Sequence, residues 1–96
     1  MNANPMSAPR TLEVLVQRGY HPGRLTIPAG EPVRLTFLRQ EAGGCSREVM
    51  FPSLGIRQEL PQGVPVTIDL PAMPAGELAF TCGMNMMRGA IVVESA

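Results

Sequence analysis

The fold of this chain is indicated most clearly by residues 25–37, LTIPAGEPVRLTF. Hydrophobic and polar residues alternate before and after the central PAGEP, and this period of two is typical of half-buried strands. In the second half, Val33, Leu35 and Phe37 share one face, which we expect to point into a core. Pro fixes φ and Gly permits a positive φ, so PAGEP predicts a turn. The stretch therefore predicts two strands joined by a short connection.

Short hydrophobic runs separated by Gly and Pro continue through the 96 residues. We expect further strands at 11–17, 48–51, 66–70, 77–81 and 89–94, and a short one at 57–60 for which a one-turn helix is the alternative. About seven to eight short strands predict one all-β domain, a sandwich of two antiparallel sheets with Greek-key connections. Residues 89–94 should be central because they are nearly all apolar. Aromatic residues are few, so the core should consist of Val, Leu, Ile and Met.

The N-terminal residues and the balance of charge restrict where the protein works and what it binds. Residues 1–10 are polar and interrupted by Pro, which predicts a flexible arm before a domain at 11–96. Eight Arg are the only basic residues and they balance eight acidic ones, which leaves no basic patch for nucleic acid or anionic lipid. No apolar run approaches the roughly 20 residues of a membrane span. We expect a cytoplasmic protein or a soluble domain of a larger membrane-associated protein, with the periplasm as the other option.

Sulfur is concentrated in residues 80–89, FTCGMNMMRG, where one Cys and three Met lie within six positions. Cys thiolate and Met thioether are soft, polarizable donors that favour Cu(I). The alternation of the preceding strand should turn the Cys82 thiol inward. Met84 and Met86 continue the same parity, and Gly83 allows the loop to curl so that both thioethers turn toward Cys82. This loop is therefore a candidate soft-metal site.

A second cysteine, Cys45, follows the polar, Gly-rich loop at residues 40–44. Loops cluster at the two ends of a sandwich, so this loop can bring Cys45 beside Cys82. A structural Cys45–Cys82 disulfide is the alternative to a metal site. We favour an all-sulfur set of Cys45, Cys82, Met84 and Met86 that binds one or two Cu(I) ions.

The number of histidines decides which copper chemistry is expected. A blue-copper site uses two His, one Cys and a weak axial ligand, whereas His21 is the only His in the chain. We therefore expect a protein that binds Cu(I) and passes it on. Met87 is a further ligand or a hydrophobic lip, His21 a ligand or a turn residue, and Glu48 a hydrogen-bond partner of a ligand loop or an exposed charge. We find no nucleophile–base pair and no phosphate-binding loop, so we do not expect an enzyme.

Four stretches together resemble the cupredoxin-like domains of bacterial copper-handling proteins: Tyr20-His21-Pro22, residues 25–37, Gly44-Cys45-Ser46-Arg47-Glu48-Val49 and residues 80–89. This group includes membrane-tethered Cu(I) chaperones and domains of copper-exporting P-type ATPases. The Cys-Gly-Met-x-Met-Met ending is the most specific part. The resemblance implies an eight-stranded cupredoxin-like Greek-key sandwich, Cu(I) ligands at Cys45, Cys82, Met84 and Met86, and a copper chaperone or resistance module that transfers Cu(I) to such an ATPase. Unlike the tethered chaperones, the chain lacks an N-terminal membrane segment.

Two other functions stand as alternatives. A small copper electron-transfer protein would need a red or green copper site, or the recruitment of His21. A metal-free module would be held together by the Cys45–Cys82 disulfide. In the favoured interpretation the protein is a monomer whose partner is a copper-exporting P-type ATPase or another copper acceptor. An incoming cysteine would displace a thioether, Met84 or Met86, during ligand exchange.

Overall fold

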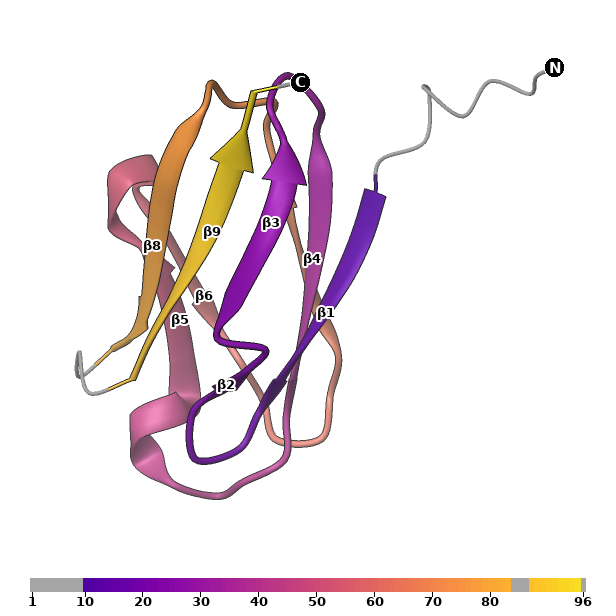
Figure 1. The fold of residues 1–96 in the computed structure, drawn as a ribbon. Helices are drawn as coiled ribbons and strands as arrows, with labels where there is room; N and C mark the ends of the chain where they lie inside the picture. The colour runs from indigo at the N-terminus through magenta and orange to yellow at the C-terminus, as the bar shows by residue number, and fades with distance from the viewer. Residues whose placement is uncertain (1–9, 84–86, 96) are drawn as a thin grey trace, which may run out of the picture.

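The computed structural model describes residues 10–83 and 87–95, which form a layered β-structure (Figure 1). Within these ranges the chain has nine strands: β1 (Arg10–Val16), β2 (Tyr20–His21), β3 (Arg24–Pro28), β4 (Val33–Arg39), β5 (Glu48–Phe51), β6 (Ile56–Glu59), β7 (Val66–Leu70), β8 (Gly76–Cys82) and β9 (Arg88–Glu94). Two 3-10 turns, η2 (Gly44–Arg47) and η3 (Pro52–Leu54), lie before and after β5. Helices long and apolar enough to cross a membrane do not occur in the described ranges.

The strands form two sheets, which confirms the predicted β-sandwich (Figure 1). One sheet has the order β2-β1-β4-β7 and the other the order β3-β9-β8-β5-β6, so β9 is an inner strand, as predicted, between β3 and β8. The prediction of purely antiparallel sheets is wrong, because β1 runs parallel to β4 and β3 runs parallel to β9. The chain crosses to the other sheet at β3 before it returns at β4, and β4 therefore enters beside β1 in the same direction.

The positions of the strands follow the hydrophobic alternation of the sequence. Each predicted strand agrees with an observed one to within one residue at either end. The irregular segment after β5 contains both predicted elements in succession, the 3-10 turn η3 and then the strand β6. The turn at residues 28–32 is also as predicted, with Gly30 at φ +83°. The two-residue strand β2 was not predicted, since two residues show no alternation.

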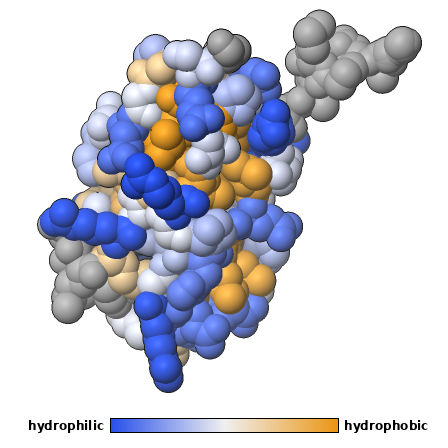
Figure 2. All heavy atoms as spheres, viewed as in Figure 1, coloured by the Kyte–Doolittle hydropathy of each residue, from blue (hydrophilic) through white to orange (hydrophobic). Residues whose placement is uncertain are grey.

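The core lies between the two sheets, and it is more aromatic than the composition predicts. Val33, Leu35 and Phe37 are buried, as their parity predicts. Phe37, Phe51 and Phe80 are all fully buried, and the ring of Tyr20 packs edge-on against Phe80 at a centroid distance of 4.8 Å. Methionine contributes less than expected, because Met73 and Met87 are only partly buried at the margin of this core. Figure 2 shows hydrophilic side chains around a central apolar area on one face.

Phe80 fits over a glycine on the neighbouring strand. In the pairing of β8 with β9, Phe80 lies opposite Gly89. A Cβ atom added to Gly89 would overlap the Phe80 ring. The ring therefore occupies the space that any other residue at position 89 would need, and the central aromatic cluster depends on this glycine.

We expect Gly89→Ala to lower the free energy of unfolding by about 1–3 kcal/mol, the range for an overpacked core. Gly43→Ala is a matched control, because Gly43 has φ −62° and its added Cβ would meet no atom within 4 Å. Urea unfolding of both variants measures the difference. A Gly89→Ala midpoint equal to that of the control would show that the Phe80 ring can shift at no cost.

A carboxylate joins two loops at the end of the molecule where β1 and β4 finish. The backbone N–H of Arg18, in the turn after β1, donates to Glu41 Oε1 at 2.7 Å. A hydrogen bond from Ser46 to Glu41 and the bond from Arg18 lower the pKa of Glu41 below its ordinary value, and the charges of Arg39 and Arg18 add to this. Ionised Glu41 therefore stabilises the connection between these loops.

Because the pKa of Glu41 is lowered in the folded state, its stabilising contribution is complete above the unfolded value of about 4.3 and is lost as the pH falls through the folded value. We expect Glu41→Gln to lose less stability on acidification from about pH 5 to about pH 3 than the wild type does. Glu13→Gln, on the exposed side of β1, is the control. Parallel curves of urea midpoint against pH for Glu41→Gln and wild type would contradict this role.

Candidate metal centre

The two loops that carry cysteine lie at the same end of the five-stranded sheet (Figure 1). Cys45 belongs to η2, which leads directly into β5. The neighbouring strand β8 ends at Cys82 and runs antiparallel to β5, with Val49 opposite Cys82. η2 also contacts β8. This register places the backbone turn that contains Cys45 beside the end of β8.

The described residues include only part of the predicted ligand set. Met84 and Met86 lie outside them, and so does the side chain of Cys45, although its backbone is described. The structure therefore brings together the backbone turn of Cys45 and the residue Cys82. The four-sulfur ligand set stays a prediction.

Cys82 is fully buried, at 0% exposure, on the core-facing parity of β8. Its backbone N–H donates to Met87 O at 3.1 Å, and the N–H of Met87 donates to Cys82 Sγ at 3.4 Å. The first bond closes the loop between residues 82 and 87. The second places a backbone donor on the sulfur.

Glu48 lies beside Gly83, which follows Cys82 and begins the loop that carries Met84 and Met86, here called the sulfur loop. A Cβ atom added to Gly83 would be 2.6 Å from Glu48 Oε1 and 2.9 Å from its Cγ. The same Oε1 atom forms an ion pair with Arg57 Nε at 3.4 Å, and the Glu48 side chain is 27% exposed. Of the two interpretations of Glu48, the structure thus shows a half-buried carboxylate beside the ligand loop, which a side chain at position 83 would have to displace.

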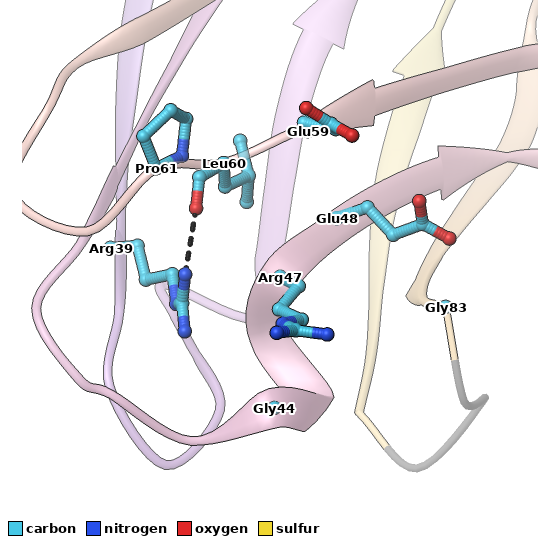
Figure 3. Close-up of a pocket in the computed structure, with 8 residues that line it drawn as sticks. All are labelled: Arg39, Gly44, Arg47, Glu48, Glu59, Leu60, Pro61 and Gly83. Atoms are coloured by element: carbon cyan, nitrogen blue, oxygen red, sulfur yellow. Dashed lines mark hydrogen bonds between the residues drawn. The ribbon is translucent and has the colours of Figure 1, made fainter.

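A pocket of about 580 Å³ opens between the two loops (Figure 3). Gly44 and Gly83, which are the chain neighbours of the two cysteines, both line it. Charged side chains of both signs complete the wall, namely Arg39, Arg47, Glu48 and Glu59, together with Leu60 and Pro61. The end of the five-stranded sheet that carries Cys82 and the Cys45 turn, which we call the site end, therefore contains a hollow lined by charged side chains.

His21 and Met87 have defined surroundings. His21 Nε2 lies 2.8 Å from Gln17 O and donates to this carbonyl, as expected for a residue that supports a turn. Met87 packs against the core at partial burial, and its two interpretations, a ligand or a hydrophobic lip, both stay predictions. Among the residues that the structure describes, no cluster of three His, Cys, Asp or Glu side chains could hold a metal ion.

A buried arginine holds the Cys45 turn, and the sequence analysis did not identify it. Arg39, at the end of β4, is 8% exposed. Its Nε donates to Ser46 Oγ at 3.0 Å, its Nη2 to Gly43 O at 2.9 Å and its Nη1 to Leu60 O at 3.0 Å (Figure 3 shows the last bond). The signal was present in the alternation of β4, because residue 39 has the same parity as Val33, Leu35 and Phe37.

Several solved copper proteins share this fold. The chain is 27% identical to the metal-binding domain of the Cu(I)-exporting P-type ATPase CopA of Streptococcus pneumoniae D39, determined with Cu(I), over 88% of this chain and 84% of that one, with a TM-score of 0.84. It is 34% identical to a copper binding protein determined by NMR in the apo form, over 88% and 86% of the two chains, with a TM-score of 0.82. Reduced auracyanin from Roseiflexus castenholzii is similar in fold alone, at 17% identity over 91% and 98% of the chains and a TM-score of 0.69.

A search of curated protein sequences found no match. The sequence profile of the cupredoxin-like domain family matches residues 2–93, which is nearly the whole chain. Together with the two-sheet architecture and the solved relatives, this match settles the family. The chain belongs to the cupredoxin-like domain family.

Proposed function

We propose that this domain binds Cu(I) through Cys45, Cys82, Met84 and Met86 and passes it by ligand exchange to a copper-exporting P-type ATPase. The observation that carries the proposal is the register of β5 and β8, which places the Cys45 turn beside buried Cys82 at one end of the sandwich. Two relatives support it. One is a metal-binding domain of a Cu(I)-exporting ATPase determined with Cu(I), and the other is a copper binding protein.

The described chemistry of Cys82 suits a Cu(I) carrier. Its sulfur is a soft donor that is buried and accepts a backbone N–H, so the described contact adds no hard oxygen donor beside it. The cysteine thiols must lose their protons to bind the metal, so Cu(I) affinity should fall as the pH is lowered. In transfer, an acceptor cysteine enters as a thioether of Met84 or Met86 leaves. The ion count stays open at one or two, and the protein acts as a carrier and not as an enzyme.

The compartment and the assembly belong to the same proposal. The domain would work in the cytoplasm, alone as a monomer or as a soluble part of a larger membrane-associated protein. Its acceptor would then present a Cu(I)-binding cysteine on the cytoplasmic side of the membrane. This chain contributes no Lys and a formal net charge of zero, so its shape and its sulfur loop would have to specify the acceptor more than any long-range electrostatic attraction.

We expect Cys82→Ser to weaken Cu(I) retention by more than the roughly 10–100-fold typical of changes outside the ligand set, because a hydroxyl is a poor Cu(I) donor. Cys82→Ala tests the same loss without burying a polar group. Met86→Leu should weaken retention less, since the other sulfurs remain. Met73→Leu, at the margin of the core, is the matched control. Competition with a chromophoric Cu(I) chelator under anaerobic conditions measures all four.

The same samples distinguish the alternatives. Cys82→Ser and Cys82→Ala proteins that compete for Cu(I) as well as the parent would disprove the ligand assignment. A lasting thiolate-to-copper absorption band after addition of Cu(II) would instead indicate an electron carrier. An absence of free thiols in protein isolated anaerobically would indicate the disulfide-linked module.

A further inference from the structure

The guanidinium of Arg39 joins three segments at the site end. Two of its acceptors, Gly43 O and Ser46 Oγ, lie on either side of Cys45 in the chain, and the third, Leu60 O, belongs to the connection between β6 and β7. Backbone bonds extend this arrangement: Leu60 N–H donates to Arg47 O at 2.7 Å, and Gly63 N–H donates to Arg39 O at 2.7 Å. The turn that contains Cys45 is therefore attached to β4 and to the β6–β7 connection.

The turn has little support of its own. η2 is a single 3-10 turn whose N-cap residue, Gly43, makes no side-chain capping bond. Ser46 departs from helical geometry, with φ −93° and ψ 16°. Short turns of this kind are marginal because their hydrogen bonds are few and poorly aligned. The conformation of the Cys45 turn therefore depends on groups outside the turn. The buried guanidinium of Arg39, which donates to residues on both sides of Cys45, is one of these groups.

Burial of a guanidinium does not by itself explain the choice of arginine. Removing a cation from water is costly, and a well-packed apolar side chain often gives equal or greater stability at such a position. What arginine offers is a planar fork of several N–H donors in fixed directions. Here the fork reaches a hydroxyl and two carbonyls, which favours a role in specifying one loop conformation.

The charge of Arg39 is balanced within the same cluster. Ser46 is 1% exposed; its Oγ accepts from Arg39 Nε, and its hydroxyl donates to Gly43 O at 3.3 Å. The charge of Arg39 also acts on Glu41. Glu41 in turn accepts from Arg18 N–H. The described charged groups around the cluster are the acids Glu41, Glu48 and Glu59 and the bases Arg39, Arg18 and Arg47. A satisfied network of this kind is rigid, whereas a partly satisfied one is not.

We propose that Arg39 is a positioning residue, which fixes the Cys45 turn in its metal-binding conformation before Cu(I) arrives. The inference rests on the proposed function and adds a residue outside the ligand set. A turn that is already ordered in the folded protein loses its conformational entropy on folding. Metal binding then does not have to offset this loss, and the affinity is higher. Arg39 would act through the backbone of residues 43–46 without touching the ion.

The experiment compares Cu(I) retention and turn protection in Arg39→Met, Arg39→Lys and Ser46→Ala. Arg34→Met is the matched control, because Arg34 lies on the same strand, is exposed and pairs with Asp69 on β7. We expect Arg39→Met to lower Cu(I) affinity about 10–100-fold, the range for residues that orient metal ligands. Arg39→Lys should not restore it, because an ammonium keeps the charge and loses the fork. Ser46→Ala, which removes one of the three contacts, should show a smaller loss.

A second readout needs no copper and separates positioning from general destabilisation. In the copper-free domain, hydrogen exchange of the Leu60 amide, which donates to Arg47 O, should accelerate in Arg39→Lys and Ser46→Ala while exchange in β8 and β9 is unchanged. If Arg39→Met does not fold, these two variants decide the question. Exchange at Leu60 equal to wild type overturns the inference, and so does wild-type Cu(I) affinity in Arg39→Met or Arg39→Lys. A wild-type domain that fails to retain Cu(I) would instead show that the proposed function is wrong.

Discussion

The antiparallel pairing of β5 with β8 is the constraint on which the site end depends. β5 begins immediately after the turn that contains Cys45, and β8 finishes at Cys82. Pairing Val49 with Cys82 therefore places both turns at one edge of the same sheet. A slip of one residue would turn every side chain of the strand to the opposite face, and it would carry Cys82 out of the core. The burial of Phe51 and Phe80, on these same two strands, fixes the register against such a slip.

Much of this architecture can be predicted from the sequence because it is encoded locally. Alternation of apolar and polar residues identifies a strand and its inward face within a few residues, which is why the positions of β4, β5, β7 and β8 follow from the chain. The direction in which strands pair is different. The parallel pairing of β1 with β4 results from a crossover to the other sheet at β3, and no residue in either strand records it.

The candidate site likewise has one part that the local sequence predicts and one part that it does not. Soft-donor chemistry and strand parity single out Cys82 and place its sulfur inward, and a side chain at position 83 would have to displace Glu48. The support of the Cys45 turn is less visible, because two of the three acceptors of Arg39 are backbone carbonyls, of Gly43 and Leu60. A carbonyl acceptor can belong to any residue type, so it leaves no trace in the sequence. Arg39 has the same parity as the inward-facing residues of β4, which predicts a buried charge. This parity does not identify the groups to which the guanidinium donates.

The two turns at the site end are held by different kinds of interaction. On the Cys82 side, the backbone bond from Cys82 N–H to Met87 O continues the β8–β9 ladder, so Cys82 itself is held by the sheet. On the Cys45 side, the turn is held by the side chain of Arg39 and by a bond from Leu60, which comes from another connection. A side chain can be replaced without disturbing the sheet. The two cysteine positions are therefore held independently. Cys82 is fixed by the strands of the sheet, whereas the Cys45 turn is fixed by a polar network that can change while the sandwich is retained.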